Sequence, residues 1–110
     1  MSVAQFRLAR RFQPSMWDAA VVELNDVAAR LAERIGPEAV VARSGQTTIA
    51  GRRARTYEID YTREGESLVD KVAFILEGRR EFQLTCRVRV DDLDAGTDAC
   101  DRLRSSFRLT

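Results

Sequence analysis

The sequence predicts an α+β fold: a curved antiparallel sheet of about five strands, with a long helix after the first strand and a short helix near the C-terminus. Three observations support this prediction. Apolar residues recur at helical spacing in one long segment, and later segments alternate apolar and polar residues as strands do. Single glycines separate these later segments where hairpin turns need a positive φ angle. A chain of 110 residues can bury one core, so we expect a single domain over residues 1–110.

The first strand and the long helix are the earliest predicted elements. Between residues 3 and 12 apolar and polar residues alternate, which indicates a strand with one apolar side. The helix follows, with Ser15 as its expected N-cap and Asp18 three residues later. Gly36 and Pro37 are expected to end it, with Gly36 as a left-handed cap. The apolar stripe of this helix consists of Trp17, Ala20, Val21, Leu24, Ala28, Leu31 and Ile35.

Four further strands and a second helix complete the predicted fold. The strands occupy residues 39–43 with a continuation at 47–49, then 54–62, 68–76 and 81–90. The strand at 68–76 is apolar on both sides, which favours a helix on each face of the sheet. In the strand at 54–62 the residues Tyr57, Ile59 and Tyr61 share one face and are interpreted as core. The second helix should start between residues 92 and 97, with Asp94 or Thr97 as its cap, and should bury Ala99, Cys100, Leu103 and Phe107.

Charge and composition argue against several classes of function. The chain has 18 basic and 17 acidic side chains, so its net charge of +1 gives no field that would attract nucleic acid. It has no histidine, the commonest metal ligand and the side chain best suited to proton transfer at neutral pH. It also has no phosphate-binding glycine loop, and the aspartates at residues 91–98 do not fit the spacing of a calcium loop. We therefore expect no enzyme, no cofactor and no metal site.

The location of the protein is predicted from its apolar segments. The longest apolar run, residues 72–76, is too short to cross a membrane. The first residues do not show the basic, apolar and small-residue pattern of an export signal. We expect a cytoplasmic protein, or a secreted or periplasmic one if a leader has been removed.

The two cysteines, Cys86 and Cys100, are expected on the core face of the last long strand and on the buried stripe of the final helix. If that helix packs over that strand, the sulfurs meet, and a bridge closing a loop of about 15 residues would stabilise the fold by roughly 3 kcal/mol. The alternatives are this bridge and two buried free thiols, because a cytosolic protein normally keeps its cysteines reduced. A catalytic thiol is disfavoured, since no histidine could activate it.

Five arginines lie in or beside two of the predicted turns: Arg52, Arg53, Arg55, Arg79 and Arg80. They would form one basic patch, suited to a phosphate or an acidic partner, if both turns lie at the same end of the sheet. Acidic residues close by in the sequence, Glu58, Asp60, Glu77 and Glu81, favour instead a solvated surface of mixed charge.

Three motifs carry a resemblance to a known fold family. They are Thr47-Thr48-Ile49-Ala50-Gly51-Arg52-Arg53-Ala54 before a tyrosine-bearing strand, Phe82-Gln83-Leu84-Thr85-Cys86, and Ser105-Ser106-Phe107-Arg108-Leu109. On these motifs, residues 15–109 resemble the PsbP/Mog-type fold of photosystem extrinsic subunits, LpqN-type lipoproteins and DcrB-like proteins. The resemblance implies one PsbP/Mog-like domain that binds proteins without catalysis. One branch, the Eag chaperones of type VI secretion, shields apolar segments of effectors.

The chain departs from this family at its N-terminal side, where the usual hairpin with a Gly-Trp near its start is absent and Trp17 belongs to the helix. The departure leaves an edge strand that a second subunit would cover, and no functional residue is transferred from the family. The leading hypothesis is a non-catalytic protein-interaction or accessory domain with an unidentified protein partner or a second copy in a homodimer. The alternative is a domain that binds a small apolar ligand or an apolar peptide, as a chaperone does. An enzyme using Glu58, Asp60 or the aspartates ranks last.

Overall fold

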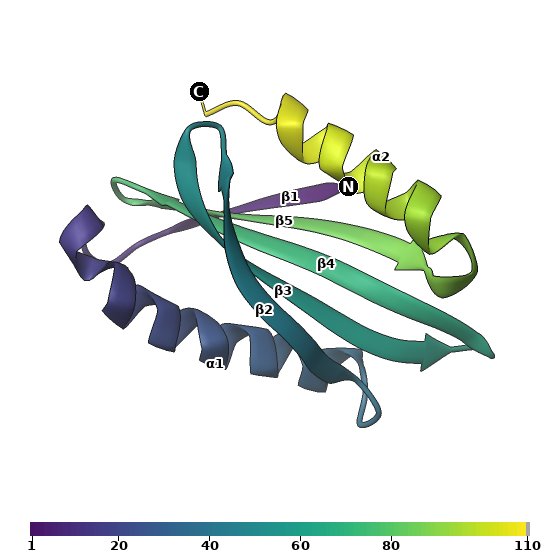
Figure 1. Cartoon of the computed structure of the whole chain (residues 1–110). Helices are drawn as coiled ribbons and strands as arrows, with labels where there is room; N and C mark the ends of the chain where they lie inside the picture. The colour runs from purple at the N-terminus through teal and green to yellow at the C-terminus, as the bar shows by residue number, and fades with distance from the viewer. Residues whose placement is uncertain (110) are drawn as a thin grey trace.

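The protein, described by a computed structural model over residues 1–109, has the predicted α+β architecture. Five strands form one antiparallel sheet in the order β1-β5-β4-β3-β2. The strands are β1 (Ser2–Arg7), β2 (Val40–Ile49), β3 (Arg52–Arg63), β4 (Glu66–Glu77) and β5 (Arg80–Arg89). Helix α1 (Trp17–Ile35) covers one face of the sheet and helix α2 (Leu93–Ser106) lies on the other (Figure 1). Single 3₁₀ turns precede the helices at Pro14–Met16 and Val90–Asp92.

Tight turns connect strands β2 to β5, as the glycines predict. Ala50 and Gly51 have φ angles of 52° and 74°, and Glu64 and Gly65 have 52° and 80°. Two successive residues with positive φ form the hairpin turn whose twist matches that of the flanking strands. At the third turn Gly78 alone has a positive φ, of 58°. These turns set the register of the meander, because a slip of one residue would turn every side chain to the opposite face.

The first core lies between α1 and the sheet. Its helical side is formed by Leu24, Ala28 and Ala32, and its sheet side by Tyr57, Ile59 and Tyr61 of β3 and Leu68, Val72, Phe74 and Leu76 of β4. The rings of Tyr57 and Phe74 meet edge to face with their centroids 5.8 Å apart, a favourable aromatic geometry. The prediction that Tyr57, Ile59 and Tyr61 are core residues is confirmed.

The second core lies on the opposite face, where Ile49, Ala54, Ala73, Ile75, Phe82 and Leu84 pack together. The C-terminal segment closes it, because the ring of Phe107 meets that of Phe82 at 5.5 Å between centroids. Helix α2 packs mainly on β5, and Cys100 is its single buried residue. The prediction that Leu103 is buried was wrong, since its side chain is 42% exposed. A helix that rests on one strand buries only a narrow stripe.

The predicted helix caps differ from the structure. Ser15 lies in the 3₁₀ turn before α1, so Met16 is the N-cap, and no side chain caps either helix. Asp94 and Thr97 lie inside α2, which begins at Leu93 after its own 3₁₀ turn. The predicted caps at Ser15, Asp94 and Thr97 were therefore wrong. A 3₁₀ turn provides tighter i→i+3 bonds at the helix entrance and shifts the first helical residue along the chain.

Three boundaries also differ from the prediction. β1 ends at Arg7 rather than near residue 12, although the backbone N–H groups of Leu8 and Phe12 still donate to carbonyls of the β4–β5 turn. The two pieces predicted at 39–43 and 47–49 form the single strand β2, with a register shift between Val41 and Arg43. Gly36 follows α1 with a φ of 159° and a ψ of 170°, so it is extended rather than left-handed.

The contact of α2 with β5 predicts the effect of replacing Gly96. A Cβ atom at this position would overlap the side chain of Val88. Gly96→Ala should lower the free energy of unfolding by about 1 kcal/mol, because overpacking outweighs the gain in helix propensity. Urea unfolding followed by circular dichroism measures this. Gly45→Ala is the control, since its Cβ would meet Thr56 at an ordinary 3.4 Å. A Gly96→Ala protein as stable as the wild type would contradict the packing described.

Candidate functional site

The sheet has two edge strands, and they differ in how they are protected. All six residues of β1 are exposed, and the apolar side chains of Val3 and Phe6 are each 48% exposed. β2 carries a register shift near Arg43 and a polar stretch of exposed residues after it. Bulges and charges are devices that keep an edge from pairing with another chain. Within residues 1–109, β1 is therefore the less protected edge.

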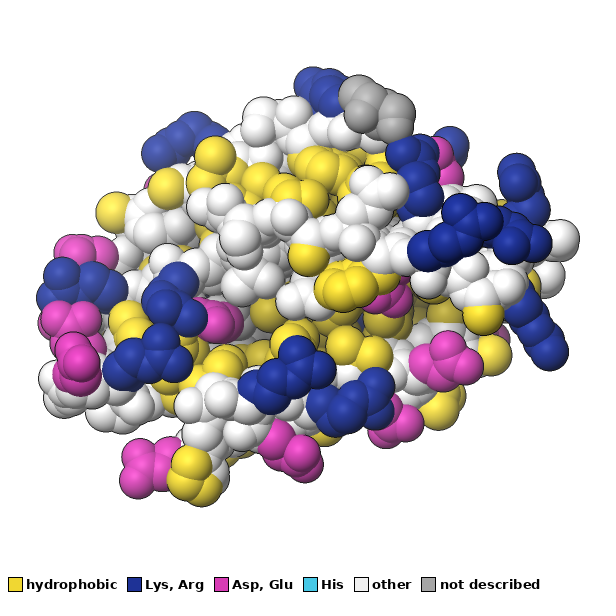
Figure 2. All heavy atoms as spheres, turned by 180° about the vertical axis from the view of Figure 1, so that it is seen from behind, with side chains coloured by type: hydrophobic (Ala, Val, Ile, Leu, Met, Phe, Trp, Pro, Cys, Tyr) yellow, Lys and Arg dark blue, Asp and Glu magenta, His cyan; other side chains and the backbone are white. Residues whose placement is uncertain are grey.

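The face of the sheet that α1 covers is left open beside β1. The helix packs over β2, β3 and β4, whereas the same face of β5 and β1 extends beyond it. By register, Ala4 lies opposite Gln83 and Phe6 lies opposite Glu81 on this open strip. Figure 2 shows hydrophobic side chains gathered in a recessed band on this side of the molecule, with both basic and acidic side chains along its border. The β5 side chains on this strip are polar, and Phe6 of β1 is the large apolar side chain beside them; the β5 residues are Glu81, Gln83, Thr85 and Arg87.

A cavity of about 240 Å³ lies between the C-terminal half of α1 and the sheet, next to this strip. Leu31 and Ile35 of α1 and Ile59 and Val72 of the sheet line it with apolar surface. Its polar lining consists of Arg34, Arg63, Asp70, Gln83 and Thr85. The cavity lies where Leu31, Arg34 and Ile35 of α1 face strands β3, β4 and β5.

Asp70 is the one buried charged residue of the described chain, with 5% of its surface exposed. Its Oδ1 atom accepts a hydrogen bond from the Tyr61 hydroxyl at 2.8 Å and one from Nε of Arg87 at 3.1 Å. The guanidinium of Arg87 also lies over the Tyr61 ring, 5.6 Å from its centroid. Burial of a carboxylate is tolerated when a charge partner and hydrogen bonds accompany it, as here.

This network shifts two pKa values. Burial, followed by the hydrogen bond to Asp70, raises the pKa of Tyr61 to about 12. The hydrogen bond to Asp70 also raises the pKa of the Arg87 guanidinium above its ordinary value. The phenol of Tyr61 therefore stays neutral and the guanidinium of Arg87 stays charged over the physiological pH range, so both remain hydrogen-bond donors there.

Sequence reasoning did not identify the Tyr61–Asp70–Arg87 network. A signal was present, because between Leu68 and Leu76 Asp70 is the single charge on a strand face that is otherwise apolar. A lone carboxylate at a core position needs a partner. The register then supplies it, since Arg87 lies directly opposite Asp70 on β5.

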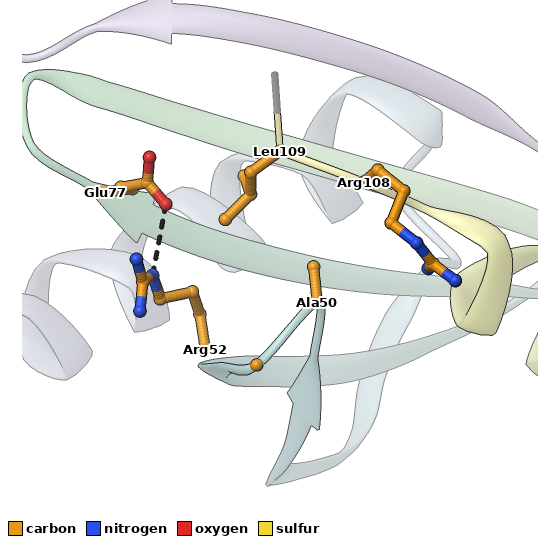
Figure 3. A pocket seen from close by; sticks show the side chains of 6 residues that line it. Ala50, Arg52, Glu77, Arg108 and Leu109 are labelled. Carbon is orange, nitrogen blue, oxygen red and sulfur yellow. Dashed lines mark hydrogen bonds and ion pairs between the residues drawn. The ribbon is translucent and has the colours of Figure 1, made fainter.

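The basic residues predicted in two turns do lie at the same end of the sheet. Glu77 of β4 connects the two turns, because its carboxylate accepts from Arg52 at 3.1 Å and from Arg80 at 2.8 Å. The hydrogen bond from Arg52 holds the pKa of Glu77 below its ordinary value. Figure 3 shows Arg52 and Glu77 joined at the mouth of an open pocket of about 580 Å³ that Arg108 and Leu109 also line.

The other predicted arginines have different surroundings. The guanidinium of Arg53 lies 5.1 Å from the centroid of the Trp17 ring, and that of Arg55 lies 5.3 Å from the Tyr57 ring. Arg79 is exposed at the turn itself. The structure thus brings Arg52 and Arg80 to one carboxylate, while aromatic rings of the core hold Arg53 and Arg55 in place.

Cys86 and Cys100 are joined in a disulfide bridge, with their Cα atoms 5.9 Å apart. The bridge ties α2 to β5 at the one buried position of the helix. The rest of this interface is less favourable, because Nε and Nη2 of Arg104 are buried without a hydrogen-bond partner within residues 1–109. Burial lowers the pKa of this guanidinium. The covalent bond therefore holds a helix in which Cys100 is the one fully buried residue.

Residues considered for acid–base chemistry are engaged or solvated. Glu58 lies 3.5 Å from Nζ of Lys71 and 3.6 Å from Nη1 of Arg43, and Asp60 is exposed. Over residues 1–109 no group of three or more histidine, cysteine or acidic side chains is placed to hold a metal ion.

Neither helix of this part of the chain is long and apolar enough to span a membrane.

Comparisons with known proteins bear on the fold. No protein-family model and no curated protein matches this sequence. Among solved structures, the chain is similar to PA94, a protein of unknown function from Pseudomonas aeruginosa, with a TM-score of 0.66 and 19% sequence identity. The alignment covers 99% of this chain and 83% of PA94. At this identity the similarity shows a shared fold.

From the raised pKa of the Tyr61 phenol we expect the free energy of unfolding to fall at alkaline pH. The folded protein binds the Tyr61 proton more tightly than the unfolded chain, so this stabilisation is complete below pH 10 and is lost as the pH rises towards 12. Tyr61→Phe should lower the free energy of unfolding by about 1–2 kcal/mol at neutral pH and should flatten this alkaline decline. Urea unfolding at about pH 8 and about pH 11 measures both effects. Tyr57→Phe removes a hydroxyl bonded to Asn25 and should keep the decline; an equal decline in all three proteins would contradict the assignment.

From the disulfide we expect a defined number of reactive thiols and a lower free energy of unfolding when the bridge is removed. In denaturant without reductant the protein should react with no thiol reagent, and after reduction both cysteines should react. Replacing Cys86 and Cys100 together by alanine should lower the free energy of unfolding by about 3 kcal/mol, because the unfolded chain loses its crosslink. Two reactive thiols before reduction would show that the bridge is absent.

Proposed function

We propose that this chain is a non-catalytic protein-interaction domain that binds an extended segment of a partner protein along β1. The observation that carries the proposal is the exposure of all six β1 residues on an edge without a bulge. In strand addition the backbone groups of an exposed edge give affinity, and alternate side chains give specificity. The resemblance of residues 15–109 to PsbP/Mog-type modules supports a protein-binding role, and the choice of β1 as the binding strand depends on its exposure alone.

The side chains of β1 indicate the partner segment that fits. Val3 and Phe6 lie on opposite faces of the sheet, and an added strand would cover the exposed half of each. Covering these surfaces contributes on the order of 1 kcal/mol for each side chain. Arg7, Arg10 and Arg11 follow, all exposed and without an ion pair within residues 1–109. The partner segment is therefore extended, apolar on both faces and flanked by acidic residues.

The disulfide supports an oxidising compartment for this interaction. Structural disulfides persist in secreted and periplasmic proteins, whereas the cytosol keeps thiols reduced. Of the two locations that the sequence allows, the bridge between Cys86 and Cys100 supports the exported one.

Substitution of Phe6 tests the proposed interface. Phe6→Lys should abolish recovery of a stoichiometric partner by tagged protein from its host, because a charge replaces the apolar contact on the edge strand. Val22→Lys is the matched control, since Val22 is 63% exposed on the outer side of α1. Hydrogen exchange of the wild-type complex should show protection of residues 2–7.

Two outcomes separate the alternatives. If light scattering shows a dimer that Phe6→Lys converts to a monomer, the partner segment is β1 of a second copy. A partner that both variants retain equally, with protection away from residues 2–7, would refute binding along β1.

A further inference from the structure

The cavity between α1 and the sheet has features of a ligand site separate from the β1 edge. Its volume of about 240 Å³ lies just below the roughly 300–1,000 Å³ typical of sites for drug-sized molecules. Leu31, Ile35, Ile59 and Val72 provide an apolar wall on both the helix and the sheet side. An occupant of this cavity is therefore small and has an apolar body.

The basic residues of the cavity lack acidic partners. Arg34 and Arg63 both line it, and neither forms an ion pair within residues 1–109. The guanidinium of Arg63 lies 5.4 Å from the centroid of the Tyr61 ring, which restricts its position. The charge of Asp70 is balanced by Arg87 at 3.1 Å. The cavity therefore has an excess positive charge in guanidinium form, which suits a carboxylate.

Asp70 has a carboxylate oxygen that accepts no hydrogen bond from residues 1–109. Its side chain is 7% exposed, and both hydrogen bonds that it accepts reach Oδ1. No hydrogen bond from residues 1–109 reaches Oδ2, although the residue lines the cavity. Oδ2 is not one of the buried unpaired atoms of residues 1–109, so solvent reaches it through the open cavity, and the O–H group of a ligand can donate to it in place of water.

Three features together select the chemical class. A purely apolar molecule would desolvate Asp70 and the arginines without pairing them, which is unfavourable. A polyanion such as a nucleotide would bring several charges close to the buried carboxylate of Asp70 and would not match the apolar wall. We propose that the cavity binds a small aliphatic hydroxy acid, with its chain on Leu31, Ile59 and Val72, its carboxylate at Arg34 and Arg63, and its hydroxyl donating to Oδ2 of Asp70. This site lies beyond the proposed protein-binding function and does not depend on it.

The test compares three probes that share one aliphatic chain: 3-hydroxyoctanoate, octanoate and 1,3-octanediol. Isothermal titration should show 3-hydroxyoctanoate binding about tenfold more tightly than octanoate, which lacks the donor for Asp70, and the diol should bind most weakly because it lacks the carboxylate. Arg34→Gln combined with Arg63→Gln should weaken 3-hydroxyoctanoate at least about tenfold. Arg30→Gln, an exposed arginine one turn before Arg34 that does not line the cavity, is the matched control and should bind like the wild type.

A structural measurement keeps the proposal testable if a variant is unstable. In the wild-type protein, nuclear Overhauser contacts should connect the chain of the ligand with methyl groups of Leu31, Ile59 and Val72. Phe6→Lys should leave this binding unchanged, so a failure of the β1 interface would not affect the result. The proposal is overturned if no probe binds at about 5 mM, a concentration that detects even weak ligands. It is also overturned if the double arginine variant binds like Arg30→Gln, or if the contacts map outside the cavity.

Discussion

Burial of β4 on both of its faces is the constraint on which the rest of the structure depends. Phe74 and Ile75 are adjacent in sequence, point to opposite faces and are both fully buried. A strand of this kind is stable only when each face is covered, and this chain has two helices to cover them. α1 is long enough to cover one face over β2, β3 and β4. α2 is short and covers the other face beside β5, with the C-terminal residues Phe107 and Leu109 completing that core.

The two helices are held in different ways. α1 buries a regular apolar stripe, so its attachment comes from hydrophobic contacts distributed along its length. Cys100 is the one buried residue of α2. Atoms Nε and Nη2 of Arg104 in the same helix are buried without a hydrogen-bond partner within residues 1–109. The disulfide at this buried position adds a covalent link to the packing of Gly96 against Val88. The structure therefore concentrates the attachment of α2 at a single bridge, whereas that of α1 is spread over many residues.

The part of the sheet that the two helices cover also determines where the buried Asp70, the cavity and the exposed β1 edge lie. α1 does not cover β5 and β1, so the apolar core under α1 ends at a cavity, and polar side chains of β5 lie beyond it. Asp70 lies at this transition, where β5 brings Arg87 next to it and β3 brings Tyr61. The buried carboxylate is tolerated because these two donors meet on one oxygen. The same arrangement leaves the other oxygen to the cavity, and it leaves β1 as an edge with exposed apolar side chains.

Much of the fold follows from local sequence. The helical spacing from Trp17 to Ile35, the alternation in β3 to β5 and the glycines at residues 51, 65 and 78 predict the elements and their order. These signals depend on residues only a few positions apart, so they are readable without tertiary structure. The errors at Ser15, Asp94 and Thr97 arose at helix starts, where a 3₁₀ turn competes with a side-chain cap.

The sequence by itself determined the α+β class, the antiparallel meander, the core face of β3 and the positions of both cysteines on buried faces. The tertiary structure alone decided that Cys86 and Cys100 are bonded, that Glu77 joins Arg52 to Arg80, and that Asp70 meets Tyr61 and Arg87. It also decided that β1 stays uncovered. Each of these features depends on which distant segments of the chain pack together. The order of the strands and the part of the sheet that α1 covers are set by the packing of the whole chain, because no local pattern of residues specifies them.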